Sequence, residues 1–430
     1  MKKRLFHLLT ILTLMAISCN QAEQNKATAG NDSAITAGKD SATTAGSDPG
    51  APAMGSFSYD LQFLRQHDSV VVLKNDSGHA QVIVSPKYQA KVFTSTAEGE
   101  SGKSFGWVNY KAFSGPVDPH MNGYGGENRF WLGPEGGKFS LFFKPGAQQV
   151  FANWKTPAAV DTESWDVTDK TEKSISMKKV MQLENYKGTK LDISVGRRIS
   201  ILGDGDVEKS TGMSLPEGVK VVAYMTDNKI TNTGTSEWNE QTGSPCIWIL
   251  DMFRPGDETV IVVPFKKTDS AGFKKVVTSD YFGAIPADRL KHTEERLFFK
   301  ADGKSRGKLG VAPSHAPTAL GSYDAKNKVL TVVTYELDRA AKYLGQRWNT
   351  TDPPFKGDAV NVYNDGPLEN GTQMGPFYEL ESVSPAAFLK PGGSLSHHQS
   401  VYHFTGDEKG LDMIALHLLG VSLSEIKKAF

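Results

Sequence analysis

Short apolar runs rich in β-branched residues, separated by turn-forming residues, recur along most of this 430-residue chain. Such runs are typical of β-strands, and the glycine, proline, asparagine and aspartate between them are typical of turns, including Asp204-Gly205. Many short strands with few helices indicate an all-β sandwich or barrel. The clearest predicted strands cover residues 70–74, 80–85, 90–94, 138–143, 174–183, 191–202, 219–226, 246–252, 259–264, 328–337 and 394–404.

Two segments have helical rather than alternating spacing. Phe57, Leu61 and Leu64 recur at helical intervals and predict a short helix over residues 57–67. The amphipathic stretch 411–430 predicts a C-terminal helix that packs against the sheets. No change of composition after residue 55 marks a second domain, so we predict one domain over residues 55–430.

The first 19 residues have the order of an export signal. Lys2, Lys3 and Arg4 precede the apolar run Leu5–Ile17, which is short for a membrane span, and Ser18 precedes Cys19. The cysteine at this position resembles the lipobox of bacterial lipoproteins. It predicts a signal peptide over residues 1–18 and lipidation of Cys19. The alternative is an ordinary signal peptide with an incidental cysteine.

Residues 20–54 consist mainly of alanine, threonine, glycine, serine, asparagine and aspartate, in three similar segments that begin at Thr28, Thr36 and Thr44. A segment this polar buries too little apolar surface to offset the entropy lost on ordering. We therefore predict a tether over residues 19–54, held to a membrane by lipid on Cys19.

Charge and cysteine content restrict the possible partners. The 48 basic and 48 acidic residues become 45 and 48 once Lys2, Lys3 and Arg4 are removed with the signal. That balance gives no basic surface for nucleic acid, so no nucleic-acid partner is predicted. The second of the two cysteines, Cys246, lies in an apolar run and is interpreted as a buried small residue rather than a nucleophile.

Glycine, aromatic and polar residues are concentrated in the segment 120–137. Trp131 offers an apolar platform for a sugar ring, and Glu127, Arg129 and Glu135 offer groups that bond hydroxyls. These residues predict a carbohydrate-binding pocket. The alternative is a glycine-rich hairpin whose aromatic residues fill the core.

Two later segments add candidate ligand-binding residues. The sequence Tyr363-Asn364-Asp365-Gly366 is typical of a turn. The turn presents Asn364 and Asp365 to a ligand, or it is purely structural. In the segment 377–383, alternation places Glu379 and Glu381 on one face of a strand. These carboxylates line a cleft, or belong to an outward polar face.

The end of the chain resembles galactose mutarotase. Leu380-Glu381-Ser382, then Leu389-Lys390-Pro391-Gly392 and the strand His397–Phe404, are similar to the last strands of that family. The segments 130–137 and 363–367 resemble hallmarks of a group of Bacteroidota lipoproteins. The resemblance implies an all-β, galactose mutarotase-like β-supersandwich with a sugar cleft on one sheet.

The resemblance also implies aldose 1-epimerase chemistry, in which a base takes the anomeric proton and an acid protonates the ring oxygen. Glu381 matches the base. The family's acid is a histidine after a Thr-Asn pair, but here Thr233 follows Asn232. His315 or His120 is the candidate replacement, although a lone histidine is more often structural. No metal site is predicted, and a calcium ion held by Glu381 with Asp365 or Glu135 is conceivable from the oxygen ligands alone.

Three functions therefore remain open. The first is an epimerase acting on a sugar or oligosaccharide, and the second is a non-catalytic carbohydrate-binding protein that lacks the acid. The third is a lyase or hydrolase that uses Glu381 with Glu379 or Asp365. The residues after Cys19 lack the acidic run associated with surface export in Bacteroidota lipoproteins, so an outer-membrane anchor facing the periplasm is expected.

Overall fold

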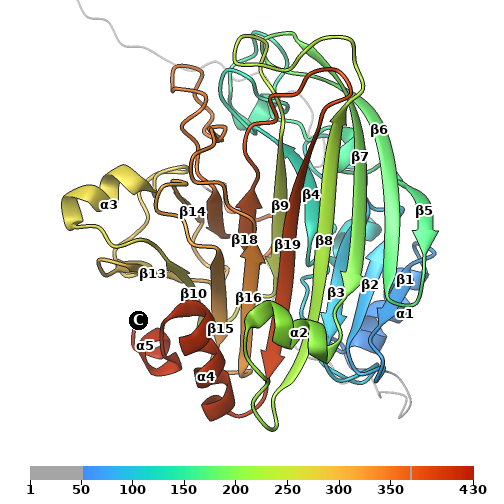
Figure 1. Ribbon diagram of the computed structural model, residues 1–430, viewed down its shortest axis with the longest axis vertical. Helices are drawn as coiled ribbons and strands as arrows, with labels where there is room; N and C mark the ends of the chain where they lie inside the picture. The colour runs from blue at the N-terminus through green and yellow to red at the C-terminus, as the bar shows by residue number, and fades with distance from the viewer. Residues whose placement is uncertain (1–51, 369) are drawn as a thin grey trace, which may run out of the picture. The chain divides into compact units, whose positions relative to one another are not determined.

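Three antiparallel sheets dominate this protein, for which a computed structural model describes residues 52–368 and 370–430 (Figure 1). The predicted signal peptide, Cys19 and nearly all of the predicted tether lie outside the described residues. The smallest sheet has the order β1-β2-β3, with β1 Val71–Lys74, β2 Gln81–Ser85 and β3 Lys91–Thr96.

The six-stranded sheet has the order β11-β14-β17-β18-β9-β4. Its strands are β4 Arg129–Gly133, β9 Cys246–Phe253, β11 Val277–Thr278, β14 Gly307–Val311, β17 Val360–Asn364 and β18 Tyr378–Val383. The ten-stranded sheet has the order β12-β13-β10-β15-β16-β19-β8-β7-β6-β5. Its strands are β5 Asp166–Lys170, β6 Ser174–Glu184, β7 Lys190–Ile201, β8 Lys220–Asn232, β10 Thr259–Pro264, β12 Leu290–His292, β13 Arg296–Lys300, β15 Ala319–Asp324, β16 Val329–Tyr335 and β19 Ser394–Thr405.

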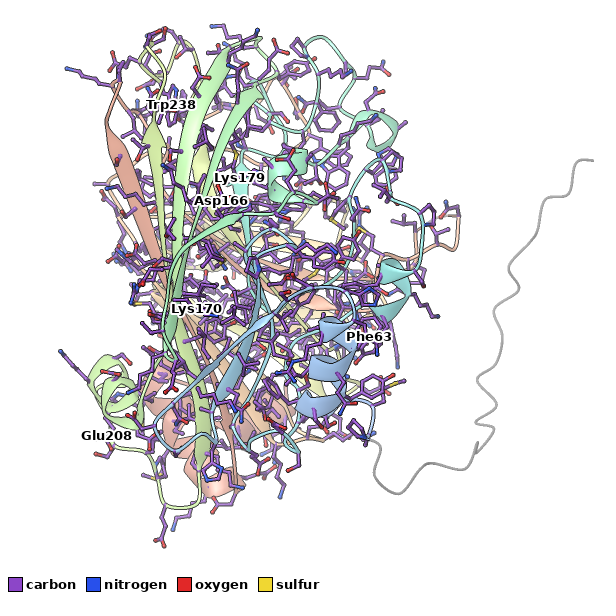
Figure 2. All side chains as sticks on the ribbon, turned by 90° about the vertical axis from the view of Figure 1, so that its right-hand side faces the viewer. Phe63, Asp166, Lys170, Lys179, Glu208 and Trp238 are labelled. Carbon is purple, nitrogen blue, oxygen red and sulfur yellow. The ribbon has the colours of Figure 1, made fainter. Side chains whose placement is uncertain are left out.

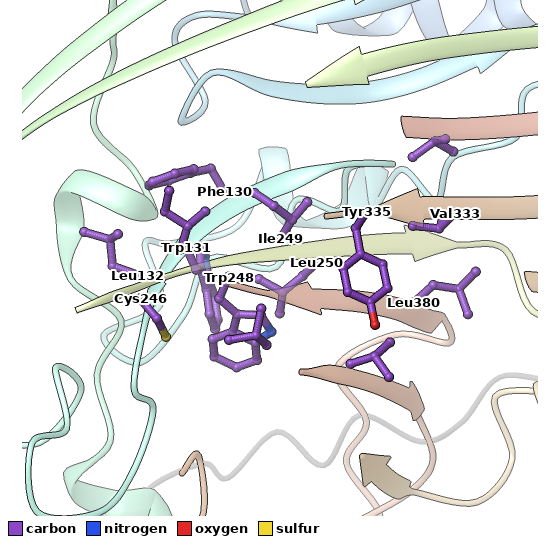
Figure 3. Close-up of a cluster of buried hydrophobic side chains, with 14 of the residues drawn as sticks. Phe130, Trp131, Leu132, Cys246, Trp248, Ile249, Leu250, Val333, Tyr335 and Leu380 are labelled. Atoms are coloured by element: carbon purple, nitrogen blue, oxygen red, sulfur yellow. The ribbon is translucent and has the colours of Figure 1, made fainter. Parts of the chain in front are cut away.

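The two larger sheets enclose the main core. Phe130, Ile249 and Leu380 of the six-stranded sheet share one buried cluster with Val333 and Tyr335 of the ten-stranded sheet (Figure 3). Polar groups also bridge the layers. Ser382 on β18 lies 2.8 Å from the Nε2 atom of His397 on β19. One face of each sheet is thus committed to the interior, and each strand has its other face free for loops, helices or solvent.

Helices cover parts of the remaining faces. Apolar side chains of α2 Asp204–Thr211, α4 Glu408–Leu419 and α5 Leu423–Lys427 pack in a second core against β10, β15, β16 and β19. The left-handed Gly420 ends α4, so the predicted C-terminal helix is present but divided in two. A further helix, α3 Ser270–Val276, precedes β11. None of the described helices is long and apolar enough to cross a membrane.

The predicted N-terminal helix is confirmed as α1 Phe57–Arg65, capped by the Ser56 side chain, which accepts a hydrogen bond from the Tyr59 amide. Its apolar face packs on the three-stranded sheet. At the far edge of the ten-stranded sheet, every residue of β5 is exposed, from Asp166 to Lys170 (Figure 2). Charged side chains on an edge strand disfavour pairing with other chains.

The all-β class is confirmed, but two local predictions are wrong. Residues 138–143 form no strand. Phe139 and Phe142 are buried among loop side chains, and the Leu141 amide donates to the Pro134 carbonyl instead of joining a ladder. Asp204-Gly205 begins α2 rather than a tight turn, because acidic residues in the first turn stabilise the helix N-terminus.

Candidate functional site

A cavity lies on the face of the six-stranded sheet that points away from the ten-stranded sheet. Lys308, Tyr363, Glu379 and Met252 are register partners across β14, β17, β18 and β9, so their side chains share this face. All four line the cavity, whose empty volume is about 540 Å³ including the open space at its mouth.

Aromatic side chains form much of the cavity wall. They come from three strands, β4, β9 and β17, and from connecting segments far apart in the sequence. The aromatic lining residues are Trp131, Phe151, Trp154, Trp248, Phe282, Trp348, Tyr363 and Phe377. Phe151, Trp154 and Trp348 stack in sequence, with ring centroids 6.1 Å apart at each step. Phe151 is 49% exposed, so this row of rings leads from the protein surface into the cavity.

Glu379 and Arg129 form a buried ion pair in the lining. The guanidinium donates to Oε1 of Glu379 and also lies 5.1 Å from the ring of Trp131. Burial raises the pKa of Glu379 to about 8; Arg129 opposes this rise and the neighbouring Glu381 adds to it. Burial thus favours the protonated form of Glu379, while the contact with Arg129 favours its carboxylate.

Glu381 lies beneath the cavity, with none of its surface exposed. Its Oε2 atom accepts hydrogen bonds from Trp248 Nε1 at 2.8 Å and from Lys308 Nζ at 2.9 Å. Its Oε1 atom has no partner among the described residues. A buried acceptor left unpaired is costly.

Glu135 reaches the cavity from the loop after β4, and burial raises the pKa of its carboxyl. Its backbone amide donates to the side chain of Gln346 at 2.6 Å. Gly136 allows the two loops to approach this closely, because a Cβ atom there would lie 2.2 Å from the Arg347 carbonyl oxygen. The glycines of the segment 133–137 thus bring Glu135 to the site.

Arg306 completes the charged lining. Its guanidinium lies 3.7 Å from the ring centroid of Phe282, and its Nε donates to the Tyr363 hydroxyl at 3.3 Å. It makes no ion pair with any carboxylate in the described part of the chain. The cavity is therefore bordered by three cations, Arg129, Arg306 and Lys308, and by the carboxyls of Glu135 and Glu379, with Glu381 below them.

The structure brings Arg129, Trp131, Glu135 and Glu379 together as predicted, but three other predicted binding residues lie elsewhere. Glu127 is fully buried and contacts Ser95 and His403 between the sheets. The side chain of Asn364 bonds the backbone of Gly303 and Ser305. Asp365 accepts from the Tyr363 hydroxyl and the Gly375 amide, so both residues shape the turn after β17.

Neither candidate acid lines the cavity. His120 lies behind the aromatic wall, where its Nδ1 is 2.6 Å from the Trp154 carbonyl oxygen and its ring stacks on Phe151. His315 lies in the loop after β14 and contacts the neighbouring Ser314. The predicted acid function of both histidines is therefore not supported by their positions.

Glu381 and Asp365 have separate hydrogen-bond partners. No group of three potential metal ligands from acidic, histidine or cysteine side chains lies together in the described residues. Cys246 is fully buried in the core, and burial raises the pKa of its thiol to about 12, which agrees with its interpretation as a small apolar residue.

Sequence reasoning missed Arg306 and Lys308. Both come from a glycine-rich segment, residues 303–310, which contains no motif. The signal for Lys308 is a lone lysine within the short strand Gly-Lys-Leu-Gly-Val, where alternation gives it one face and Leu309 the other. Phe151 begins a three-residue 3-10 helix that ends before Trp154, and Trp348 lies in a loop. No periodic pattern in these short segments predicts the direction of a side chain.

The described residues form a large β-sandwich with an aromatic-walled, charged cavity on the outer face of its smaller sheet. The chain belongs to the family of unknown function DUF6786, whose model matches residues 55–430. No curated protein sequence matches the chain.

Several solved structures are similar to this chain at low identity. The Slr1438 protein from Synechocystis sp. PCC 6803 has a TM-score of 0.46 and 11% identity over 79% of this chain and 97% of that chain. A galactose mutarotase-like protein from Lactobacillus casei ATCC 334 has a TM-score of 0.43 and 12% identity, over 78% and 100%. The second protein is described by the class that the closing strands of this chain resemble.

Proposed function

We propose that the cavity on the six-stranded sheet binds a sugar. The observation that carries this proposal is the combination of stacked aromatic walls with buried carboxyl and guanidinium groups on one sheet face. An aromatic ring packs on the apolar face of a sugar, and convergent charged groups bond its hydroxyls. Glu379, Arg129 and Arg306 are the groups placed to make those bonds.

Aldose 1-epimerase chemistry is a second candidate, favoured by the raised pKa of Glu379. Burial favours the protonated form of this carboxyl, so Glu379 is the group that would supply the acid that the sequence lacks in histidine form. Glu379 would protonate the ring oxygen while Glu381 takes the anomeric hydroxyl proton, and the bond between the anomeric carbon and the ring oxygen breaks. Reclosure on the other face returns both protons. Because Glu381 is covered, this step requires a side-chain movement that opens its Oε1 atom to the sugar.

The test uses the mature chain without lipid and a panel of freshly dissolved aldoses and glycan fragments. Tryptophan fluorescence reports binding, because four tryptophans line the cavity. Proton-exchange NMR at the anomeric carbon reports epimerisation. Binding without faster anomer exchange supports the binding protein, and faster exchange that is lost in Glu381→Gln supports the epimerase. If neither signal appears with any sugar of the panel, both proposals are contradicted. Glu425→Gln, on the exposed side of α5, is the control.

We also propose that the protein is a lipoprotein held by Cys19 on the outer membrane and facing the periplasm. This proposal rests on the order of charged, apolar and small residues before Cys19 and on the absence of an acidic run after it.

A further inference from the structure

A second pocket adjoins the aromatic cavity. It is polar rather than aromatic, with an empty volume of about 580 Å³ that includes the open space at its mouth. The side chains of Tyr281, Arg347, Asn349, Asp352 and Asp358 contribute to its lining, together with backbone of the loop 345–357. None of the residues that we predicted from sequence to bind a ligand lies in it.

The two pockets share their dividing walls. Trp348 lines the aromatic cavity, while its chain neighbours Arg347 and Asn349 line the polar pocket. The facing loop also contributes to both pockets: Glu135 lines the aromatic cavity and Gly137 lines the polar pocket. The two loops touch at Gly136, whose missing side chain allows the Arg347 carbonyl to approach. The two pockets therefore lie on either side of these two loops.

Tyr281 connects the floors of the two pockets. Its ring lies 5.7 Å from Lys308 Nζ, in the aromatic cavity, and 5.7 Å from Arg347 Cζ, in the polar pocket. Its hydroxyl donates to Asp358 at 2.6 Å and accepts from Asn361 Nδ2 at 3.2 Å. Asn361 is the register partner of Glu381. Hydrogen bonds and strand pairing thus link the polar pocket to the residues beneath the cavity.

The polar pocket carries the functional groups of a hydroxyl-binding site. Asp358 is 4% exposed, and burial raises the pKa of its carboxyl to about 6, against the hydrogen bond from Tyr281. Arg347 is partly exposed and pairs with the exposed Asp280, which leaves further guanidinium donors for a ligand. The side-chain Oδ1 atom of Asn361 is buried and has no hydrogen-bond partner in the described part of the chain.

We propose that the ligand is an oligosaccharide that spans both pockets, with one ring against the aromatic walls and the adjacent ring held by Arg347 and Asp358. This inference rests on the proposed sugar-binding function of the aromatic cavity and adds the length of the ligand to it. A free monosaccharide fills the first pocket and leaves the second to solvent.

The experiment compares ligands that differ only in length. The probes are methyl glycosides of glucose, galactose, mannose, xylose and glucuronic acid, each with its di- and trisaccharide, titrated into the full mature chain by calorimetry. For the sugar that binds, we expect the disaccharide to bind at least about tenfold more tightly than the methyl glycoside. Arg347→Gln and Asp358→Asn should remove that gain and leave the affinity for the methyl glycoside within about twofold.

Arg198→Gln, at an exposed position of the ten-stranded sheet, is the matched control and should retain the gain. Arg347→Gln changes a half-exposed residue, so the test remains decisive if Asp358→Asn fails to fold. Equal affinity for mono- and disaccharide in the unmodified protein would overturn the two-ring site and leave the proposed sugar binding intact. No binding of any probe would count against both.

Discussion

Glu379 and Glu381 lie two residues apart on one face of β18, yet they pair with cations on opposite sides of that strand, each two strands away. Arg129, on the outer strand β4, bonds Glu379, and Lys308, on β14, bonds Glu381. Register places Lys308 in the row of Glu379 and Arg129 in the row of Glu381, so the two ion pairs cross diagonally. Together, the two crossed ion pairs hold the Glu379 and Glu381 carboxyl groups close to each other on this face of the sheet.

Removing Lys308 should therefore destabilise the fold. Lys308→Met leaves the fully buried Glu381 without its cation, and breaking a buried pair in this way typically costs about 3–5 kcal/mol. The double variant with Glu381→Gln should recover most of the loss, because no charge is then left unpaired. Urea denaturation measures the free energy of unfolding. Lys342→Met, at an exposed ion pair with Glu240, should change it little.

Glu379 should make stability depend on pH. Its pKa is about 8 in the folded protein, above the usual value of 4.5, so the folded state binds the proton more tightly than the unfolded state. The stabilisation is complete below the unfolded pKa and is lost as pH rises through about 8. The free energy of unfolding should fall from pH 5 to pH 8, and Glu379→Gln should flatten that slope. An unchanged slope in Glu379→Gln would refute the raised pKa.

Phe151 should contribute more to sugar binding than to stability. Its ring is the half-exposed first member of the stacked row and packs on His120 and Trp154, so Phe151→Ala removes ligand contact together with part of that packing. We expect a loss of affinity of about five- to tenfold with only a small decrease in melting temperature. Val150→Ala, at the adjacent exposed residue outside the cavity lining, is the control for fluorescence titration. Equal losses in both variants would contradict a specific function of the aromatic ring.

Cys19 should determine whether the protein is bound to membrane. A lipidated cysteine adds buried methylene groups that hold the chain on a bilayer, and Cys19→Ser removes the attachment site. After cell fractionation, the unmodified protein should sediment with outer membranes. In cells grown with radiolabelled palmitate, the Cys19→Ser precursor should remain uncleaved and should incorporate no label. Labelling that persists in Cys19→Ser would exclude the proposed anchor. Cys246→Ser is the control, because its thiol is buried in the core.

The sequence by itself determined the elements whose pattern is local. Alternation along residues 378–383 placed Glu379 and Glu381 on one face and Leu380 on the other, as the pairing of β18 confirms. Helical spacing at Phe57, Leu61 and Leu64 identified α1. These predictions succeeded because a strand or helix imposes its own repeat on side-chain direction, whatever it packs against.

The tertiary structure alone decided which faces became the site. Glu127 and Arg129 are two residues apart at the start of β4, yet Glu127 turned inward to His403 while Arg129 reached the cavity. Lys308 and Trp348 meet the same cavity from segments 40 residues apart, and Trp348 lies in a loop, where no local repeat fixes the direction of its side chain. Which sheet face is enclosed, and which loops cover the other, depends on packing between distant segments, so the sequence supplied the candidate residues and the fold selected among them.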